Sequence, residues 1–291
     1  MKKTLIIFSV IALCSCTTLN IENSKLIDEK QKSNNEERDL DSVKQEESLL
    51  TVFKNQNIEK ENCKMVFAPE KVSLKKFYKD NRSQLIFTKQ TLLKVNNEKS
   101  LLQDSFGEEN EVENSLIIPI KENEIVEKGD FLIIISPKTK TLSFVKVVDA
   151  KNPKQPLVKD LDDPNNKKNE LLTENSFIKI EQDFSKGAIL VVKEGDNYFK
   201  EFLLCEQDGA VLTLSENFKL NIRQKQNILP VNLKRKYIAG EDVFFTQSGK
   251  YTPAVIKSVD NEEATAVILF NENGKNKEKV LSTIHITKNL E

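Results

Sequence analysis

The chain is short of the side chains that most catalytic sites use. Its 291 residues include no tryptophan and a single histidine, His285. A Ser-His-Asp or Cys-His site would have to use that histidine, and no Gly-x-Ser-x-Gly motif accompanies it. A zinc site needs several Cys or His ligands, but after residue 15 only Cys16, Cys63, Cys205 and His285 are present, none at ligand spacing. We therefore expect no nucleophilic enzyme, no bound metal and no cofactor.

An excess of charge of one sign is also missing. Lys and Arg number 44 and Asp and Glu number 45, so the formal net charge is −1. Proteins that bind nucleic acids usually carry a basic patch or a basic balance, so this partner is not expected. After the N-terminal segment no stretch is long and apolar enough to span a membrane, which takes about 20 residues as a helix. The chain has room for one large or several small domains.

The N-terminus has the pattern of a signal peptide. Lys2 and Lys3 precede an apolar run over residues 5–13. This run is too short to cross the hydrocarbon core of a bilayer, so it does not predict a spanning anchor. We expect residues 1–15 to be removed.

The end of this run, Leu13-Cys14-Ser15-Cys16, resembles the lipobox of bacterial lipoproteins. The resemblance implies cleavage after Ser15 and a mature chain that starts at Cys16, with palmitate or similar acyl chains on this residue. Cleavage before Cys14 would instead place the bulky Leu13 at the cut. Several acyl chains make a lasting membrane anchor, because each buried methylene contributes about 0.8 kcal/mol. An ordinary secretory signal with incidental cysteines is the alternative.

The segment after the anchor predicts a flexible tether. Residues 16–62 contain no Gly or Pro and one aromatic, Phe53, among many Glu, Asn, Lys and Ser residues. Such a composition buries too little apolar surface to fold alone. The Lys, Asn, Ile and Glu bias resembles spirochaete lipoproteins. Thr17 stands where enteric lipoproteins kept at the inner membrane carry an acidic residue, so the resemblance favours the outer membrane, with the surface and the periplasmic face both open.

From residue 63 the pattern is mainly β. Short β-branched and aromatic runs alternate with polar turns, as in strands. Apolar runs end at residues 120, 180, 231 and 286, and Gly129, Gly187 and Gly240 each precede a further strand after the first three. A period of this length indicates tandem modules. We expect a degenerate β module at 63–120, β modules at 121–180 and 181–231, and a last module at 232–291.

Residues 239–286 resemble a Tudor domain, a small bent barrel of the SH3-like kind. The matching features are a Gly-acid-x-Val opening, the turn at Ser248-Gly249 and a Tyr-x-Pro-Ala-x-Ile strand. In Tudor domains that read methylated arginine, four aromatic side chains form a cage for the cation. Those positions correspond here to Phe245, Thr252, Phe270 and Asn273, of which two are not aromatic. The resemblance therefore implies tandem SH3/Tudor-like barrels without methyl-cation binding.

Several other residues have two readings. Cys63 and Cys205 could form a disulfide in an exported protein, or each could be an ordinary buried thiol. His285 is expected in a final strand, on the face opposite the core. The acidic run at 160–163 lacks the glycine and the closing glutamate of an EF-hand and is read as a polar loop. The basic cluster at 234–236 is read as a solvated linker.

Two functions follow from these patterns. The first is a membrane-anchored lipoprotein of the cell envelope whose β-barrel modules bind an unknown protein or glycan. The second is a periplasmic envelope-maintenance protein that binds cell-wall peptide or glycan, as SH3-like modules do in other bacteria. Neither requires an enzyme activity or a nucleic acid.

Replacing Cys16 with Ser should abolish lipidation, because only this thiol is expected to carry diacylglycerol. Incorporation of radiolabelled palmitate into the expressed protein measures it, and the protein should then partition to the aqueous phase of a detergent extraction. Cys14→Ser is the matched control and should leave labelling intact. Continued labelling of Cys16→Ser would refute the assignment.

Overall fold

A computed structural model describes most of the chain after residue 61. The described residues are Leu50, Phe53, Gln56, Ile58 and the ranges 62–80, 83–166, 168–181, 183–288 and Leu290, all within one compact unit, Val43–Glu291. The predicted signal peptide, Cys16 and most of the predicted tether lie outside these residues. Within the described part, no helix has the length and apolar character needed to cross a membrane.

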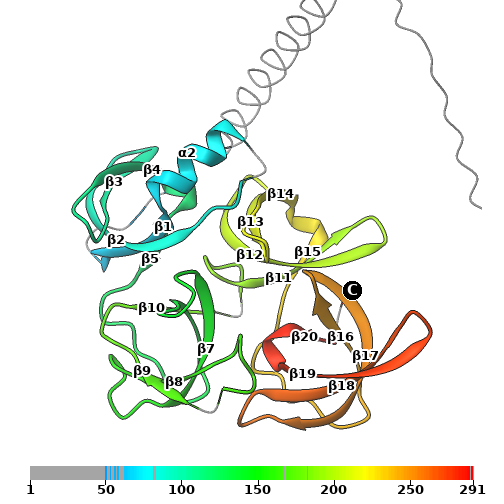
Figure 1. The fold of residues 1–291 in the computed structure, drawn as a ribbon. Helices are drawn as coiled ribbons and strands as arrows, with labels where there is room; N and C mark the ends of the chain where they lie inside the picture. The colour runs from blue at the N-terminus through cyan, green and yellow to red at the C-terminus, as the bar shows by residue number, and fades with distance from the viewer. Residues whose placement is uncertain are drawn as a thin grey trace, which may run out of the picture. The chain divides into compact units, whose positions relative to one another are not determined.

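The described residues form a mainly β structure of small antiparallel sheets, which confirms the expected fold class (Figure 1). The first ten strands are β1 (Met65–Pro69), β2 (Phe87–Val95), β3 (Lys99–Gln103), β4 (Glu109–Glu113), β5 (Ile118–Ile120), β6 (Phe131–Ile135), β7 (Leu142–Asp149), β8 (Leu157–Asp160), β9 (Asn169–Leu171) and β10 (Phe177–Lys179). The remaining strands are β11 (Ile189–Glu194), β12 (Asn197–Gln207), β13 (Ala210–Ser215), β14 (Leu220–Gln224), β15 (Ile228–Pro230), β16 (Asp242–Gln247), β17 (Lys250–Asp260), β18 (Thr265–Glu272), β19 (Lys275–Ser282) and β20 (Ile286–Thr287).

One strand order occurs four times along the chain. The first group is ordered β4-β3-β2-β1-β5, and the second is ordered β10-β6-β7-β8-β9, so that the fifth strand returns to pair with the first. The third group (β11 to β15) and the fourth (β16 to β20) repeat this order and are joined into one sheet by the pairing of β12 with β17. We refer to the four groups as the first to the fourth module. Each falls within one of the ranges expected from the sequence.

The modules also share local irregularities. Gly129, Gly187 and Gly240 all have positive φ, from +84° to +94°, and each donates its backbone N–H to a carbonyl of the second strand of its module. This conformation favours glycine, because a Cβ atom would be strained there. The second strand of every module then carries a register shift, at Leu92/Lys94, Val147/Asp149, Leu203/Cys205 and Ile256/Ser258. A bulge of this kind bends a strand, so the four sheets curve at equivalent places.

The first module differs by a helix that the sequence analysis did not expect. Helix α2 (Lys71–Lys79) lies between β1 and β2 and buries Leu74 and Phe77, which share one helical face. Ser73 is buried as well, and its hydroxyl donates to the carbonyl of Glu70 at 3.0 Å. The helix therefore packs buried side chains against the first module. The alternating pattern of strands does not predict this helix.

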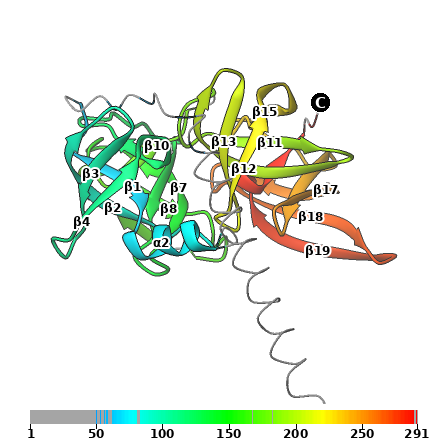
Figure 2. The ribbon, with the colours of Figure 1, turned by 90° about the horizontal axis from the view of Figure 1, so that it is seen from above.

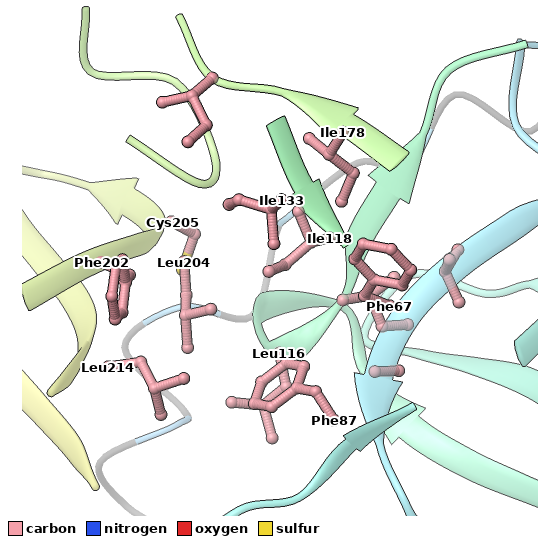
Figure 3. Packing of buried hydrophobic residues seen from close by; sticks show 14 of the residues in the cluster. Phe67, Phe87, Leu116, Ile118, Ile133, Ile178, Phe202, Leu204, Cys205 and Leu214 are labelled. Atoms are coloured by element: carbon pink, nitrogen blue, oxygen red, sulfur yellow. The ribbon is translucent and has the colours of Figure 1, made fainter. Parts of the chain in front are cut away.

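A single apolar cluster joins the four modules. It contains Ile118 from β5, Ile133 from β6, Leu204 from β12, and Ile284 from the 3-10 helix η4 (Thr283–His285), all at most 2 % exposed. Figure 3 shows Phe202, Leu204 and Leu214 of the third module opposite Ile118 and Ile133. The second, third and fourth modules each have an additional smaller core of their own. Burial of apolar surface is the main favourable term in folding, so the shared cluster ties the modules into one body.

The packed part of the chain begins before the predicted boundary at residue 63. Leu50, Phe53 and Ile58 are buried and belong to the shared cluster. Gln56 donates its side-chain amide to the carbonyl of Glu206 at 3.1 Å, and Asn114 donates to the carbonyl of Gln56 at 3.1 Å. These residues therefore contact both the first and the third module. The few apolar side chains of this segment are buried because they pack against the apolar surfaces of the modules.

The last hairpin has a charged edge. In Figure 2, β18 and β19 form a long two-stranded ribbon in the fourth module. Strand β19 pairs only with β18, and its first six residues are exposed and include Lys275, Lys277 and Lys279. Lysines on an edge strand oppose pairing with another chain, so this edge is protected against aggregation.

Leu204→Ala should destabilise all four modules together, because Leu204 lies in the cluster that they share. A loss of about 2–5 kcal/mol in the free energy of unfolding is expected for a buried leucine. Hydrogen exchange followed by mass spectrometry in urea would show faster exchange in peptides of every module. The exposed Leu229→Ala is the matched control and should change stability by less than about 0.5 kcal/mol. Faster exchange confined to the third module would contradict the shared core.

Candidate functional site

A cavity lies where the four modules meet. Its volume is about 230 Å³, and most of its wall is apolar. The lining side chains come from every module and include Ile118, Ile133, Leu142, Phe144, Asp162, Lys200, Phe202, Leu204, Leu214, Glu216, Phe218 and His285. The cavity is therefore a product of the assembled unit and has no complete wall within any one module.

Lys200 is the most unusual side chain of this cavity, because its side chain is only 1 % exposed. Its Nζ lies 3.1 Å from His285 Nδ1 and 3.5 Å from Glu216 Oε1. The same ammonium stands 5.3 Å from the ring centre of Phe144 and 5.9 Å from that of Phe202, which attract a cation. Burial lowers the pKa of Lys200, and the negative charge of Glu216 partly offsets this effect. The sequence analysis did not identify this residue.

Two carboxylates face the same cavity. Burial alone would raise the pKa of Glu216, but its contacts with His285 and Lys200 outweigh this effect and lower the pKa to about 2. No described residue forms a hydrogen bond of good geometry with Glu216 Oε1. Asp162 is better satisfied, since its Oδ2 accepts from the hydroxyl of Ser143 at 2.6 Å and from the backbone N–H of Phe144 at 3.3 Å. Glu216 is thus the carboxylate with free hydrogen-bonding capacity.

His285 was expected as a solvated strand residue, and this prediction was wrong. It lies in η4 and its side chain is 26 % exposed. Lys200 Nζ at 3.1 Å and Thr246 Oγ1 at 3.2 Å both approach Nδ1, and Glu216 Oε1 is 3.8 Å from the same atom. A catalytic triad needs the nucleophile and the orienting carboxylate on opposite ring nitrogens, so these contacts do not form one. Burial, followed by the charge of Lys200, lowers the pKa of His285.

Cys63 and Cys205 are both free and buried, so the disulfide considered from the sequence is not formed in the structure. Burial raises the pKa of Cys63 to about 11 and that of Cys205 to about 12. Thiols with such values stay protonated at neutral pH and are poor nucleophiles. Lys186, whose charge partly offsets this rise at Cys205, donates to the carbonyls of Asn114 and Ile117 at 3.2 and 3.0 Å.

The four cage positions do not form an open cage. Phe245 is fully buried in the core of the fourth module, with its ring centre 4.9 Å from that of Phe270. Thr252 is the cross-strand partner of Phe245, and Asn273 lies in the β18–β19 turn with a φ of +54°. Lys279 Nζ stands 5.6 Å from the Phe245 ring centre. Phe245 thus contributes to packing, and the absence of methyl-cation binding stays a prediction.

The basic cluster at 234–236 is not a simple solvated linker. Lys234 Nζ pairs with Oδ1 of the buried Asp130 at 2.9 Å, and Arg235 pairs with Glu241 at 2.6 Å. Asp130 also pairs with Lys179 at 2.9 Å. The Lys234–Asp130 pair ties the link between the third and fourth modules to the second module, a contact that residue spacing alone could not reveal.

The acidic run at 160–163 shows loop hydrogen bonds. Asp160 Oδ1 accepts from the backbone N–H of Asp162 at 3.0 Å, and Asp163 Oδ1 accepts from that of Asn165 at 3.2 Å. Across the described residues, no three Cys, His, Asp or Glu side chains gather in an arrangement that could hold a metal ion. These contacts describe a polar loop.

A second hollow is open and aromatic. It is a groove of about 540 Å³ at the junction of the third and fourth modules, lined by Asp196, Asn197, Tyr198, Phe244, Lys250, Tyr251, Pro253, Lys288 and Leu290. The pairing of Phe199 with Lys250 joins β12 to β17 and places the two sides of the groove together. Lys193 Nζ lies 5.6 Å from the ring centre of Tyr198. The hydroxyl of Tyr251 is buried and has no hydrogen-bond partner among the described residues.

His285 should make stability depend on pH. The unfolded chain binds a proton below the ordinary histidine pKa of 6.5, whereas the folded pKa is lower. The free energy of unfolding should therefore fall as pH drops from about 6.5 towards the folded pKa, by at most about 1.4 kcal/mol per pH unit. Glu216 should add a further loss between pH 4.5 and about 2.

Urea unfolding of the wild type and of His285→Gln between pH 7.5 and 5 measures the first loss. The variant should lack this loss. Equal pH dependence of both proteins above pH 5 would show that His285 is not buried as a neutral side chain.

The sequence matches no protein family, and no curated protein is similar to it at a significant level. The SH3/Tudor-like resemblance of residues 239–286 therefore stays a prediction.

Proposed function

We propose that this protein is a lipid-anchored binding protein of the cell envelope. Its acyl chains on Cys16 hold it at a membrane, and its four modules act as one body that binds a protein or glycan partner. The observation that carries the proposal is the open aromatic groove between the third and fourth modules.

The chemistry of the groove suits a partner with both apolar and polar groups. Tyr198, Phe244 and Pro253 offer flat apolar surfaces on which the C–H face of a sugar ring or an aliphatic side chain can pack. Lys250 and Asn197 add hydrogen-bonding groups at the same place. Interfaces and ligand sites typically combine aromatic side chains with a few polar groups in this way.

The ionisable side chains support binding in preference to nucleophilic catalysis. The thiols of Cys63 and Cys205 have raised pKa values, and the contacts of His285 converge on one nitrogen. Lys200 forms an ion pair with Glu216 of its own module and contacts His285 of the fourth.

Replacing both Tyr198 and Lys250 with Ala should abolish partner binding, because the change removes a ring and a charge from the groove. The chain immobilised on beads would be tested against a membrane extract and, separately, against purified cell-wall sacculi. Phe106→Ala, which removes a 91 % exposed ring of the first module, is the matched control and should bind as the wild type does. Undiminished capture by the Tyr198 and Lys250 variant would contradict the groove as the binding site.

A further inference from the structure

The central cavity is large enough for a small organic molecule. A closed apolar cavity of about 150 Å³ in another protein holds benzene, and this one measures about 230 Å³. It is smaller than the sites of most drug-sized ligands, which have about 300–1,000 Å³. A ring or a short aliphatic body with one polar group would fit between Leu204 and Ile133, which face each other across the junction in Figure 3.

The polar wall offers both a donor and an acceptor. An ammonium has three N–H donors, and that of Lys200 approaches His285 Nδ1 and Glu216 Oε1 within ion-pair or hydrogen-bond distance. Glu216 Oε1 accepts no hydrogen bond of good geometry from a described residue. An unsatisfied buried acceptor is costly, so a ligand group that donates to Glu216 and accepts from Lys200 would be stabilised there. A hydroxyl or an amide does both.

The charges around the cavity disfavour an anionic ligand. One ammonium, Lys200, faces two carboxylates, Glu216 and Asp162, while burial and the charge of Lys200 lower the pKa of His285 and so favour its neutral form. A ligand carboxylate would add a third negative charge beside Glu216 and Asp162, and like charges at short distance repel. A cationic group would in turn be forced next to Lys200. The wall is therefore complementary to a neutral polar group.

We infer that the central cavity binds a small neutral amphiphile that carries one hydroxyl or amide on an aromatic or aliphatic body. The apolar side chains hold the body, and the Lys200–Glu216 pair orients the polar group. This site is distinct from the groove, so it can be present whether or not the groove binds a partner.

Methyl NMR of the full chain carrying Cys16→Ser tests the inference with two matched probes, 2-phenylethanol and phenylacetate. The alcohol should shift the methyl resonances of Ile133 and Leu204 in a saturable way and leave that of Leu229 unchanged. The carboxylate should bind at least tenfold more weakly, because it meets Glu216 and Asp162. Equal affinity for the two probes, or shifts that spare Ile133 and Leu204, would overturn the inference.

A cavity-filling variant provides a second measurement. Leu142→Phe adds volume at a half-buried part of the wall and leaves the charged side chains in place. It should lower the affinity for 2-phenylethanol at least tenfold, whereas Leu229→Phe at an exposed position should not change it. If Leu142→Phe does not fold, the probe shifts measured in the parent chain still test the inference. Unchanged affinity in a folded variant would contradict binding in the cavity.

Discussion

The shared apolar cluster is the interaction on which the rest of the structure depends. Each module has five strands, and all four modules contribute buried apolar side chains to the one cluster. Phe144 of the second module stacks on Phe202 of the third with ring centres 5.0 Å apart, and Ile118 and Ile284 complete the cluster from the first and fourth modules. The cavity, the groove and the packing of Leu50, Phe53 and Ile58 all require this assembly.

Lysines that reach from one module to another give the assembly its specificity. Lys186 donates to two carbonyls of the first module, and Lys146 donates to the carbonyls of Asn261 and Glu262 in the fourth, both at 2.8 Å. Lys200 Nζ lies 3.1 Å from His285 Nδ1, across the junction of the third and fourth modules. Removing one partner of a buried hydrogen bond leaves a polar group unsatisfied, which costs about 1–3 kcal/mol. Such contacts favour one arrangement of the modules over others that would bury the same apolar area.

The sequence predicted what is local and missed what depends on distant partners. Strand alternation was sufficient to predict a mainly β structure after residue 63, because this signal acts within a few residues. Lys200 could have been found, since it shares a strand face with Phe202 and Leu204. The contacts of His285 and the docking of Phe53 could not, because both rest on side chains far away in the chain. Nor could the cavity, whose wall comes from four modules.

The most direct test of one shared core is a double-mutant cycle on the stack between the second and third modules. Phe144→Leu and Phe202→Leu, alone and combined, would be measured by the free energy of unfolding in urea. A contacting aromatic pair predicts a coupling of about 0.5–1.5 kcal/mol. Additive effects of the two changes, with a coupling near zero, would mean that the modules do not pack against each other at this stack and would contradict the shared core.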